Sequence, residues 1–139
     1  MRRTLAGLVL GAIAIGGVAP AAQAIEPEPS PNPEPIVLER IELQCRKAVV
    51  KVTIADQERD KLVIGCRWSQ SQRRNFAGYK VYRKVDDQAR HLWFATRNRE
   101  RTKAIDWRVQ RDHTYTYRLV VVNPDGRIIG ISNKVSVST

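Results

Sequence analysis

Two arginine-rich stretches carry most of the chemistry that this sequence offers. Arg73 and Arg74 stand side by side in a polar segment between two predicted strands. The segment 96–103 holds four cations and one acid, and a predicted turn near residue 125 is followed by another arginine. Arginine presents a planar set of N–H donors that pairs with sulfate, phosphate and carboxylate groups, often through two hydrogen bonds at once. The candidate binding residues are therefore Arg73, Arg74, Arg97, Arg99, Arg101, Lys103 and Arg127.

The sequence offers little that could perform catalysis. Its two histidines, His91 and His113, stand at no spacing from other ligand types that indicates a metal site. It has no glycine-framed serine and no phosphate-cradling glycine loop. His113 could act as a base that Asp112 orients, next to Thr114. The same residue types are also typical of a turn, and we favour the turn. We predict a protein that is not an enzyme and that uses no cofactor or metal.

Cys45 and Cys66 are the two cysteines of the chain. In an exported protein a single pair of cysteines predicts one disulfide. If the strands on either side of Asp56–Asp60 form a hairpin in which Ile54 pairs with Lys61, Cys66 lies opposite Val49. A bridge from Cys66 to Cys45 would then need a bulge or an earlier bend in the first strand. The alternative is that Cys66 is a small buried residue on the inner side of a strand.

The N-terminus predicts export. Residues 1–24 comprise a short basic start, an apolar run and the sequence Ala22-Gln23-Ala24, which are the three parts of a cleavable signal peptide. We expect cleavage before Ile25 and a secreted, periplasmic or cell-surface location. An uncleaved membrane anchor is the alternative, but the apolar run is shorter than the roughly 20 residues that span a bilayer.

A linker and one domain follow the signal peptide. Residues 25–35 alternate proline with polar or acidic residues, which favours an extended, semi-rigid chain. Residues 36–139 are enough for a single domain with its own core. The chain has a formal net charge of +10, and the excess lies in this domain because the linker contributes acids. Such a charge attracts polyanions or anionic membranes without defining a function.

The domain shows the alternation of β-strands and no helical periodicity. A two-residue period covers 62–68, where every second position is held by Leu62, Ile64, Cys66 and Trp68. A second segment with the same period covers 115–122. Asn123-Pro124-Asp125-Gly126 is typical of a turn. Short strands at regular spacing without helices predict an all-β fold, an antiparallel sandwich of two sheets.

An ordered set of motifs resembles the fibronectin type III domain over residues 48–138. Its elements are the strand ending at Trp68, the sequence Gly78-Tyr79-x-Val81-Tyr82-Arg83, the run 114–126 and the closing segment 132–137. The resemblance implies about seven strands, at 48–55, 61–69, 78–85, 90–96, 103–108, 113–123 and 128–138. It also implies structural roles for Trp68 in the core, for Tyr79, and for Tyr115, whose hydroxyl would bond to upstream backbone.

The same topology predicts where the arginines meet. Consecutive strands of such a sandwich run in opposite directions, so alternate loops share one end, and both arginine-rich segments and the 123–127 turn would converge there. We expect a binding module for an acidic polymer or an acidic protein surface, with an anionic membrane as a further partner. The alternative is an inhibitor or effector that plugs a partner's site with rigid loops. Nucleic acid is not expected, because export removes the chain from it and no reading element is present. The alternative for the arginines is that they serve only solubility.

Overall fold

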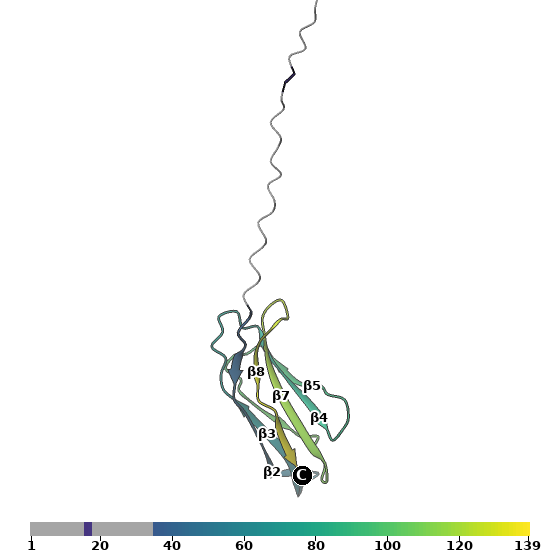
Figure 1. Cartoon of the computed structure of the whole chain (residues 1–139). Helices are drawn as coiled ribbons and strands as arrows, with labels where there is room; N and C mark the ends of the chain where they lie inside the picture. Colours follow the sequence, from purple (N-terminus) through teal and green to yellow (C-terminus); the bar gives the residue numbers. More distant parts are fainter. Residues whose placement is uncertain (1–15, 18–34) are drawn as a thin grey trace, which may run out of the picture. The chain divides into compact units, whose positions relative to one another are not determined.

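β-Strands supply the regular structure of the described part of this chain. The computed structural model describes residues 16–17 and 35–139 and contains nine strands and no helix within them (Figure 1). Residues 35–139 form one unit. Except for Gly16, Gly17 and Pro35, the predicted signal peptide (1–24) and linker (25–35) lie outside the described residues. In the described ranges no helix is long and apolar enough to cross a membrane.

The strands form two sheets, which confirms the predicted all-β, two-sheet fold. The larger sheet has the order β1-β8-β7-β4-β5, with β9 also paired to β7, and the smaller sheet has the order β2-β3-β6. β1 runs parallel to β8, and the other pairs are antiparallel. The strands are β1 (Glu39–Ile41), β2 (Leu43–Ile54), β3 (Gln57–Trp68), β4 (Gly78–Val85), β5 (His91–Thr96), β6 (Lys103–Asp106), β7 (Thr114–Val122), β8 (Ile128–Ser132) and β9 (Val135–Ser138).

The hairpin of β2 and β3 differs from the predicted register. Its turn is the two-residue loop Ala55-Asp56, and both residues adopt the left-handed conformation, with φ of 49° and 60°. This is the conformation of the tight hairpin turn whose twist matches that of the flanking strands. Because the turn is two residues long rather than the six between Ile54 and Lys61, Ile54 pairs with Gln57 and Cys45 lies directly opposite Cys66. The expectation that Cys66 faces Val49 is therefore wrong, and the bridge needs no bulge.

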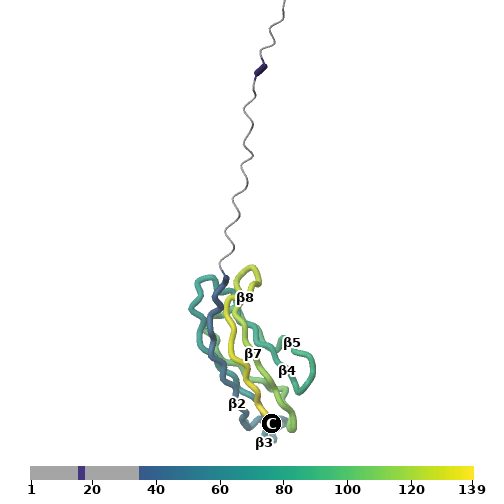
Figure 2. The backbone as a smooth tube through the Cα atoms, in the orientation of Figure 1, coloured from purple at the N-terminus to yellow at the C-terminus, as the bar shows by residue number. Residues whose placement is uncertain are grey.

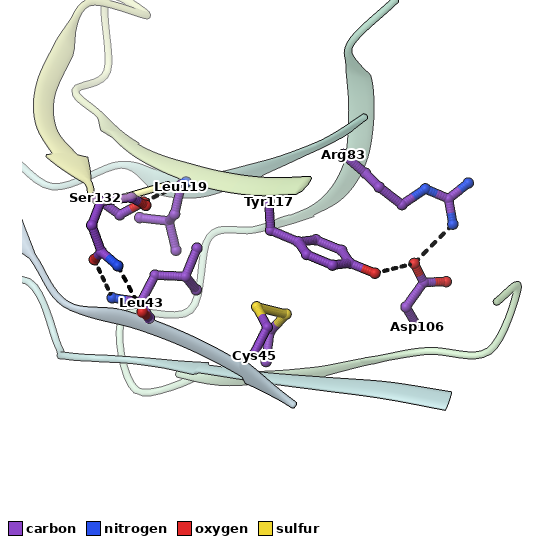
Figure 3. Close-up of a disulfide and its surroundings, with 9 residues drawn as sticks. Leu43, Cys45, Arg83, Asp106, Tyr117, Leu119 and Ser132 are labelled. Carbon is purple, nitrogen blue, oxygen red and sulfur yellow. Dashed lines mark hydrogen bonds and ion pairs between the residues drawn. A yellow bond between two sulfur atoms is a disulfide. The ribbon is translucent and has the colours of Figure 1, made fainter. Parts of the chain in front are cut away.

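The two cysteines form the disulfide Cys45–Cys66, with Cα atoms 4.1 Å apart. Both side chains belong to the core and lie between the sheets (Figure 3). A bridge that joins two neighbouring strands fixes their register and restricts the unfolded chain. A disulfide also indicates an oxidising compartment.

The last predicted strand, 128–138, is divided into β8 and β9. The division falls at Asn133, whose side-chain amide accepts a hydrogen bond from the Leu43 nitrogen (2.9 Å) and donates one to the Leu43 oxygen (3.0 Å). Next to it, the Ser132 hydroxyl accepts the backbone N–H of Leu119 (2.8 Å) (Figure 3). Asn133 thus substitutes for a strand partner of Leu43 and links the two sheets. This break and the short β1 explain why nine strands occur instead of about seven.

Trp68 occupies the centre of the core, as expected for that residue. Its side chain is 5% exposed and packs edge-on against Tyr79, with ring centroids 5.7 Å apart. Phe94 of β5 lies on its other side at 6.0 Å. Aromatic pairs of this geometry add to the free energy gained by burial alone.

A buried carboxylate joins the sheets at a second place. Asp106 of β6 is 1% exposed, and its Oδ2 accepts hydrogen bonds from the Tyr117 hydroxyl and from Arg83 Nη1, both at 2.8 Å (Figure 3). Its Oδ1 accepts the backbone N–H of Arg108 (3.0 Å). Burial, and next the bond to Asp106, raise the pKa of Tyr117 far above its ordinary value. The carboxylate of the small sheet is therefore matched by donors of the large sheet.

Replacing Asp106 tests this link. Asp106→Asn keeps the size of the side chain but leaves the largely buried guanidinium of Arg83 without its counter-charge, so unfolding should become easier by about 3 kcal/mol. Asp125→Asn, in an exposed turn, is the matched control and should change stability by less than about 0.5 kcal/mol in chemical denaturation. Equal stabilities of the two variants would show that the link contributes nothing.

Candidate functional site

Three connections meet at one end of the domain, and we call them the loop pole: residues 69–77, 97–102 and 123–127. The Ala77 nitrogen donates to the Val122 oxygen (2.8 Å), which ties the first connection to the strand before the third. The Trp68 nitrogen donates to the Thr102 oxygen (3.0 Å), which ties the end of the strand before the first connection to the second connection. Figure 2 shows the connections β3–β4 and β7–β8 at the end opposite the C-terminus. The three predicted loops thus share one end.

The Tyr79 hydroxyl connects two of these loops. It accepts the backbone N–H of Ser71 (2.8 Å) and donates to the backbone oxygen of Arg99 (2.9 Å). Ser71 is fully buried, so its N–H has no access to water. Burial, as the largest cause, raises the pKa of Tyr79 above its ordinary value, so the hydroxyl keeps its proton under neutral conditions.

A carboxylate completes the fixation of the first loop. Glu39 of β1 accepts hydrogen bonds from the Ser71 hydroxyl (2.6 Å) and the Gln72 nitrogen (2.7 Å). The loop is therefore held from two sides, by Tyr79 and by Glu39. Both anchors belong to strands, which explains how a nine-residue polar segment keeps one conformation.

Two of the predicted binding arginines serve this fixation. Arg99 is half-buried; its guanidinium lies 5.0 Å from the centre of the Phe76 ring, and Nη1 donates to the Ser71 oxygen (3.5 Å). Arg73 donates to the backbone oxygen of Val37. These two guanidinium groups are thus engaged with the protein itself, where they stabilise the loops.

The other predicted residues are exposed. Arg74, Arg97 and Arg127 reach solvent, and Arg101 lies over the Phe94 ring, 5.1 Å from its centre. Lys103 is not in the loop as predicted. It belongs to β6, lies opposite Arg67 of β3, and faces the outside of the small sheet.

A recess of about 480 Å³ lies where the loop pole meets β4 and β5. Arg97 and Lys80 are the two cations that line it, and no acid lines it among the described residues. Gly78 is at its wall; a Cβ there would lie 2.9 Å from the Thr96 oxygen, so only glycine allows this close approach of β4 to β5. The remaining lining residues are Ala77, Tyr79, Ala95, Thr96, Val122, Asn123, Pro124 and Gly126.

Lys80 is the functional candidate that loop-based reasoning missed. It lies in β4, between the inward residues Tyr79 and Val81. The alternation of that strand places Lys80 outside, which is a signal available in the sequence. The recess is thus built from a strand cation and a loop cation.

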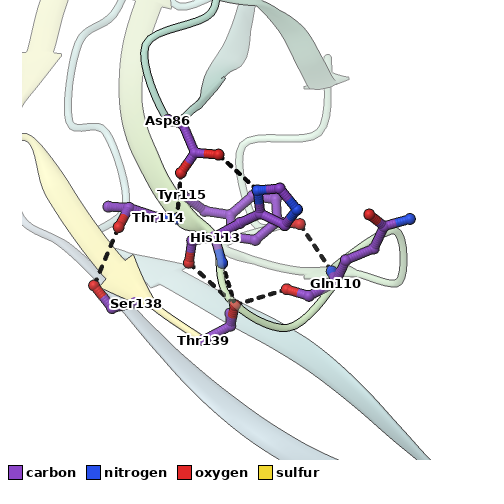
Figure 4. Close-up of polar contacts among 7 residues, drawn as sticks. All are labelled: Asp86, Gln110, His113, Thr114, Tyr115, Ser138 and Thr139. Atoms are coloured by element: carbon purple, nitrogen blue, oxygen red, sulfur yellow. Dashed lines mark hydrogen bonds and ion pairs between the residues drawn. The ribbon is translucent and has the colours of Figure 1, made fainter.

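A second group of polar contacts lies at the opposite end (Figure 4). His113 Nδ1 is 2.6 Å from Asp86 Oδ2, and the Thr114 nitrogen donates to Asp86 Oδ1 (2.8 Å). The bond to His113, and next the bond to Thr114, lower the pKa of Asp86. The partner of His113 is therefore Asp86 and not Asp112.

The surrounding contacts identify this group as a structural corner. The Thr139 hydroxyl donates to the Gln110 oxygen (2.6 Å) and accepts the His113 backbone N–H (3.2 Å). The Tyr115 hydroxyl accepts the backbone N–H of Gln110 (2.8 Å), the kind of upstream contact that the resemblance implies for this tyrosine. These hydroxyls bond backbone groups that a corner leaves without strand partners. In residues 35–139 no three His, Cys, Asp or Glu side chains gather closely enough to hold a metal ion.

Comparison with known proteins gives structural likenesses only. No family model and no curated protein sequence matches the chain. Pectate lyase PelI from Erwinia chrysanthemi, solved with tetragalacturonic acid, is similar over 66% of this chain and 28% of its own, with 19% identity and a TM-score of 0.46. Pectate lyase Pel3 from Pectobacterium carotovorum is similar over 73% of this chain and 27% of its own, with 14% identity and a TM-score of 0.49. A structure described as a myokine is similar over 74% of this chain and 98% of its own, with 12% identity and a TM-score of 0.49. This chain therefore spans little more than a quarter of the length of either lyase.

Removal of the Tyr79 hydroxyl should loosen the loop pole. Tyr79→Phe leaves the buried Ser71 N–H without an acceptor, which should cost about 1–3 kcal/mol and speed hydrogen exchange at that amide. Tyr82→Phe, on the outer side of the same strand, is the control and should leave the Ser71 amide unchanged. If exchange at Ser71 is unaffected in Tyr79→Phe, the hydroxyl does not organise these loops.

Proposed function

We propose that this chain is an exported, non-catalytic binding module of the fibronectin type III kind, and that its loop pole binds an acidic polymer or an acidic protein face. The oxidised pair Cys45–Cys66 supports an oxidising location, and the signal-peptide pattern of residues 1–24 supports export to it. The partition of the strands into β2-β3-β6 and a larger sheet supports the fold family, because immunoglobulin-like sandwiches divide their strands between two sheets in this way.

The observation that carries the proposal is the recess at the loop pole. Concave sites with a few convergent polar groups are the usual places of binding. Here the polar groups are the cations Lys80 and Arg97, with Arg127 in the adjoining connection. A sulfate, carboxylate or phosphate group in the recess would receive the guanidinium fork of Arg97 and the ammonium group of Lys80.

The anchored loops support binding with little loss of entropy. Tyr79 and Glu39 already hold the β3–β4 connection in one conformation, so a partner need not order it. Arg73 and Arg99 contribute to the same rigidity. In this arrangement Arg73 and Arg99 stabilise the loops, and the exposed arginines contact the partner.

Neutralising the recess tests the proposal. The double variant Lys80→Gln/Arg97→Gln should weaken binding to heparin, a soluble probe polyanion, by about 1 kcal/mol for each cation, or roughly thirtyfold together. Affinity should be measured at about physiological salt, where the Debye length is roughly 8 Å and distant exposed charges are screened.

The matched control removes two cations at the other end. Arg108→Gln/Arg111→Gln, in the exposed β6–β7 connection, changes the net charge equally and should alter affinity only slightly. Equal losses in the two double variants would mean that the arginines form only a solvated surface. Affinity that hardly changes with salt would instead favour a rigid plug with an apolar anchor, the alternative class of partner.

A further inference from the structure

The outward face of the small sheet has an unusual composition. Alternation along β2 and β3 directs one set of side chains toward the core: Cys45, Leu62 and Ile64 belong to it. The set between them points away from the larger sheet. We call it the outer face, and its members are Gln44, Arg46, Ala48, Val50, Val52 and Ile54 of β2, Gln57, Arg59, Lys61, Val63, Gly65 and Arg67 of β3, and Lys103 and Ile105 of β6.

The outer face is cationic and has no acid in these three fully described strands. Its cations are Arg46, Arg59, Lys61, Arg67 and Lys103. The acids of the strands, Glu58, Asp60 and Asp106, all lie at inward positions of the alternation. Contacts agree with this division, because Lys51 pairs with Glu58 (3.5 Å) on the inward side.

The polar groups of the outer face are almost exclusively donors. The side-chain oxygen of Gln44 accepts Nε and Nη2 of Arg67 (3.1 and 2.8 Å). The side-chain oxygen of Gln57 accepts Nη2 of Arg59 (3.3 Å). Both amide acceptors are thus occupied by neighbours on the same face. A partner that complements this surface must supply acceptors, such as phosphate oxygens.

Aliphatic residues lie among the cations. Ile54 at the tip of the hairpin is 56% exposed and Ile105 of β6 is 49% exposed, while Val50 and Val52 are half-buried. Gly65 leaves a hollow between Arg46 and Ile105, since a Cβ there would meet no atom within 4 Å. Directly after β6, Trp107 is 46% exposed, and tryptophan is enriched where apolar and polar phases meet.

We propose that the outer face docks on the surface of an anionic phospholipid bilayer. Lipid phosphates supply the acceptors that the cations lack, and the acyl boundary receives the aliphatic side chains. A hydrophilic polymer would leave Ile54 and Ile105 in water. The outer face of a second copy of the chain would place its five cations opposite these five, and like charges repel. The proposal goes beyond the function assigned to the loop pole, since it uses other residues and another partner.

Vesicle sedimentation tests this docking with the exported chain. The chain should bind vesicles of equal parts phosphatidylcholine and phosphatidylglycerol and should not bind vesicles of phosphatidylcholine alone. Arg59→Gln/Lys61→Gln should reduce binding roughly 25-fold, since each cation near an anionic surface contributes about fivefold. Ile54→Thr should reduce it at least fourfold, because the change removes more than one buried methylene group and each is worth about fourfold.

The same two strands offer controls on their inward side. Lys47→Gln/Lys51→Gln removes the same charge, and Val49→Thr replaces a methyl group by a hydroxyl at a residue that is 58% exposed. Both should bind anionic vesicles as the unchanged chain does. Lys80→Gln/Arg97→Gln should also keep vesicle binding, and the outer-face variants should keep heparin binding. Either proposal can therefore be refuted while the other stands.

Three results would overturn the proposal. The first is an unchanged chain that does not bind anionic vesicles. The second is an equal loss from outward and inward charge variants, which would reduce the effect to net charge. The third is an Ile54→Thr variant with unchanged binding, which would assign the face to a phosphate-bearing polymer or an acidic protein instead of a bilayer.

Discussion

The register of β2 against β3 is the constraint on which the rest of the domain depends. Because side chains alternate along a strand, a shift by one residue would exchange every inward residue of the hairpin for an outward one. The two-residue turn Ala55-Asp56 sets the register, and the disulfide Cys45–Cys66 fixes it covalently. In this register Ile64 and Trp68 fill the core.

The same register separates the charges of the small sheet. Glu58 and Asp60 are directed to the inward side, and Arg59 and Lys61 to the outer face. These four consecutive residues of alternating sign therefore place their acids on one side of the hairpin and their cations on the other. The net charge of +10 does not reveal this separation of acids and cations, because a sum does not distinguish between the two sides of a strand.

The loop pole follows a different rule. Its connections have no ladder of their own, so strand residues hold them: Tyr79 through its hydroxyl and Glu39 through its carboxylate. Arg99 packs on Phe76 and becomes part of the same support. A basic loop in a sequence can thus consist of arginines that bind the protein itself and arginines that remain available to a partner.

Sequence pattern was sufficient for some of these features. Alternation at 62–68 and 115–122 predicts strands, and Trp68 is a core residue in both descriptions. The shared end of the three loops also follows from strand order. The tight turn at Ala55-Asp56 was missed because it contains none of the glycine or asparagine that normally marks left-handed residues, and the error displaced the predicted register by four residues. Lys103 was counted with the loop although the predicted strand 103–108 already contained it, and it lies in β6 opposite Arg67. The cross-sheet bonds of Asn133 and Asp106 join residues far apart in the chain and are invisible to local pattern.

We propose that the position of the cations, and not their sum, gives this domain two separate binding surfaces. Backbone amide NMR measures this most directly, by titration first with a short heparin oligosaccharide and then with lipid discs containing phosphatidylglycerol. The first ligand should shift amides around the recess, such as Lys80, Arg97 and Gly126, and the second should shift amides of the outer face, such as Val52, Arg59 and Ile105. The same set of shifts with both ligands, or weak shifts spread over all basic residues, would show that the domain does not have two separate binding surfaces.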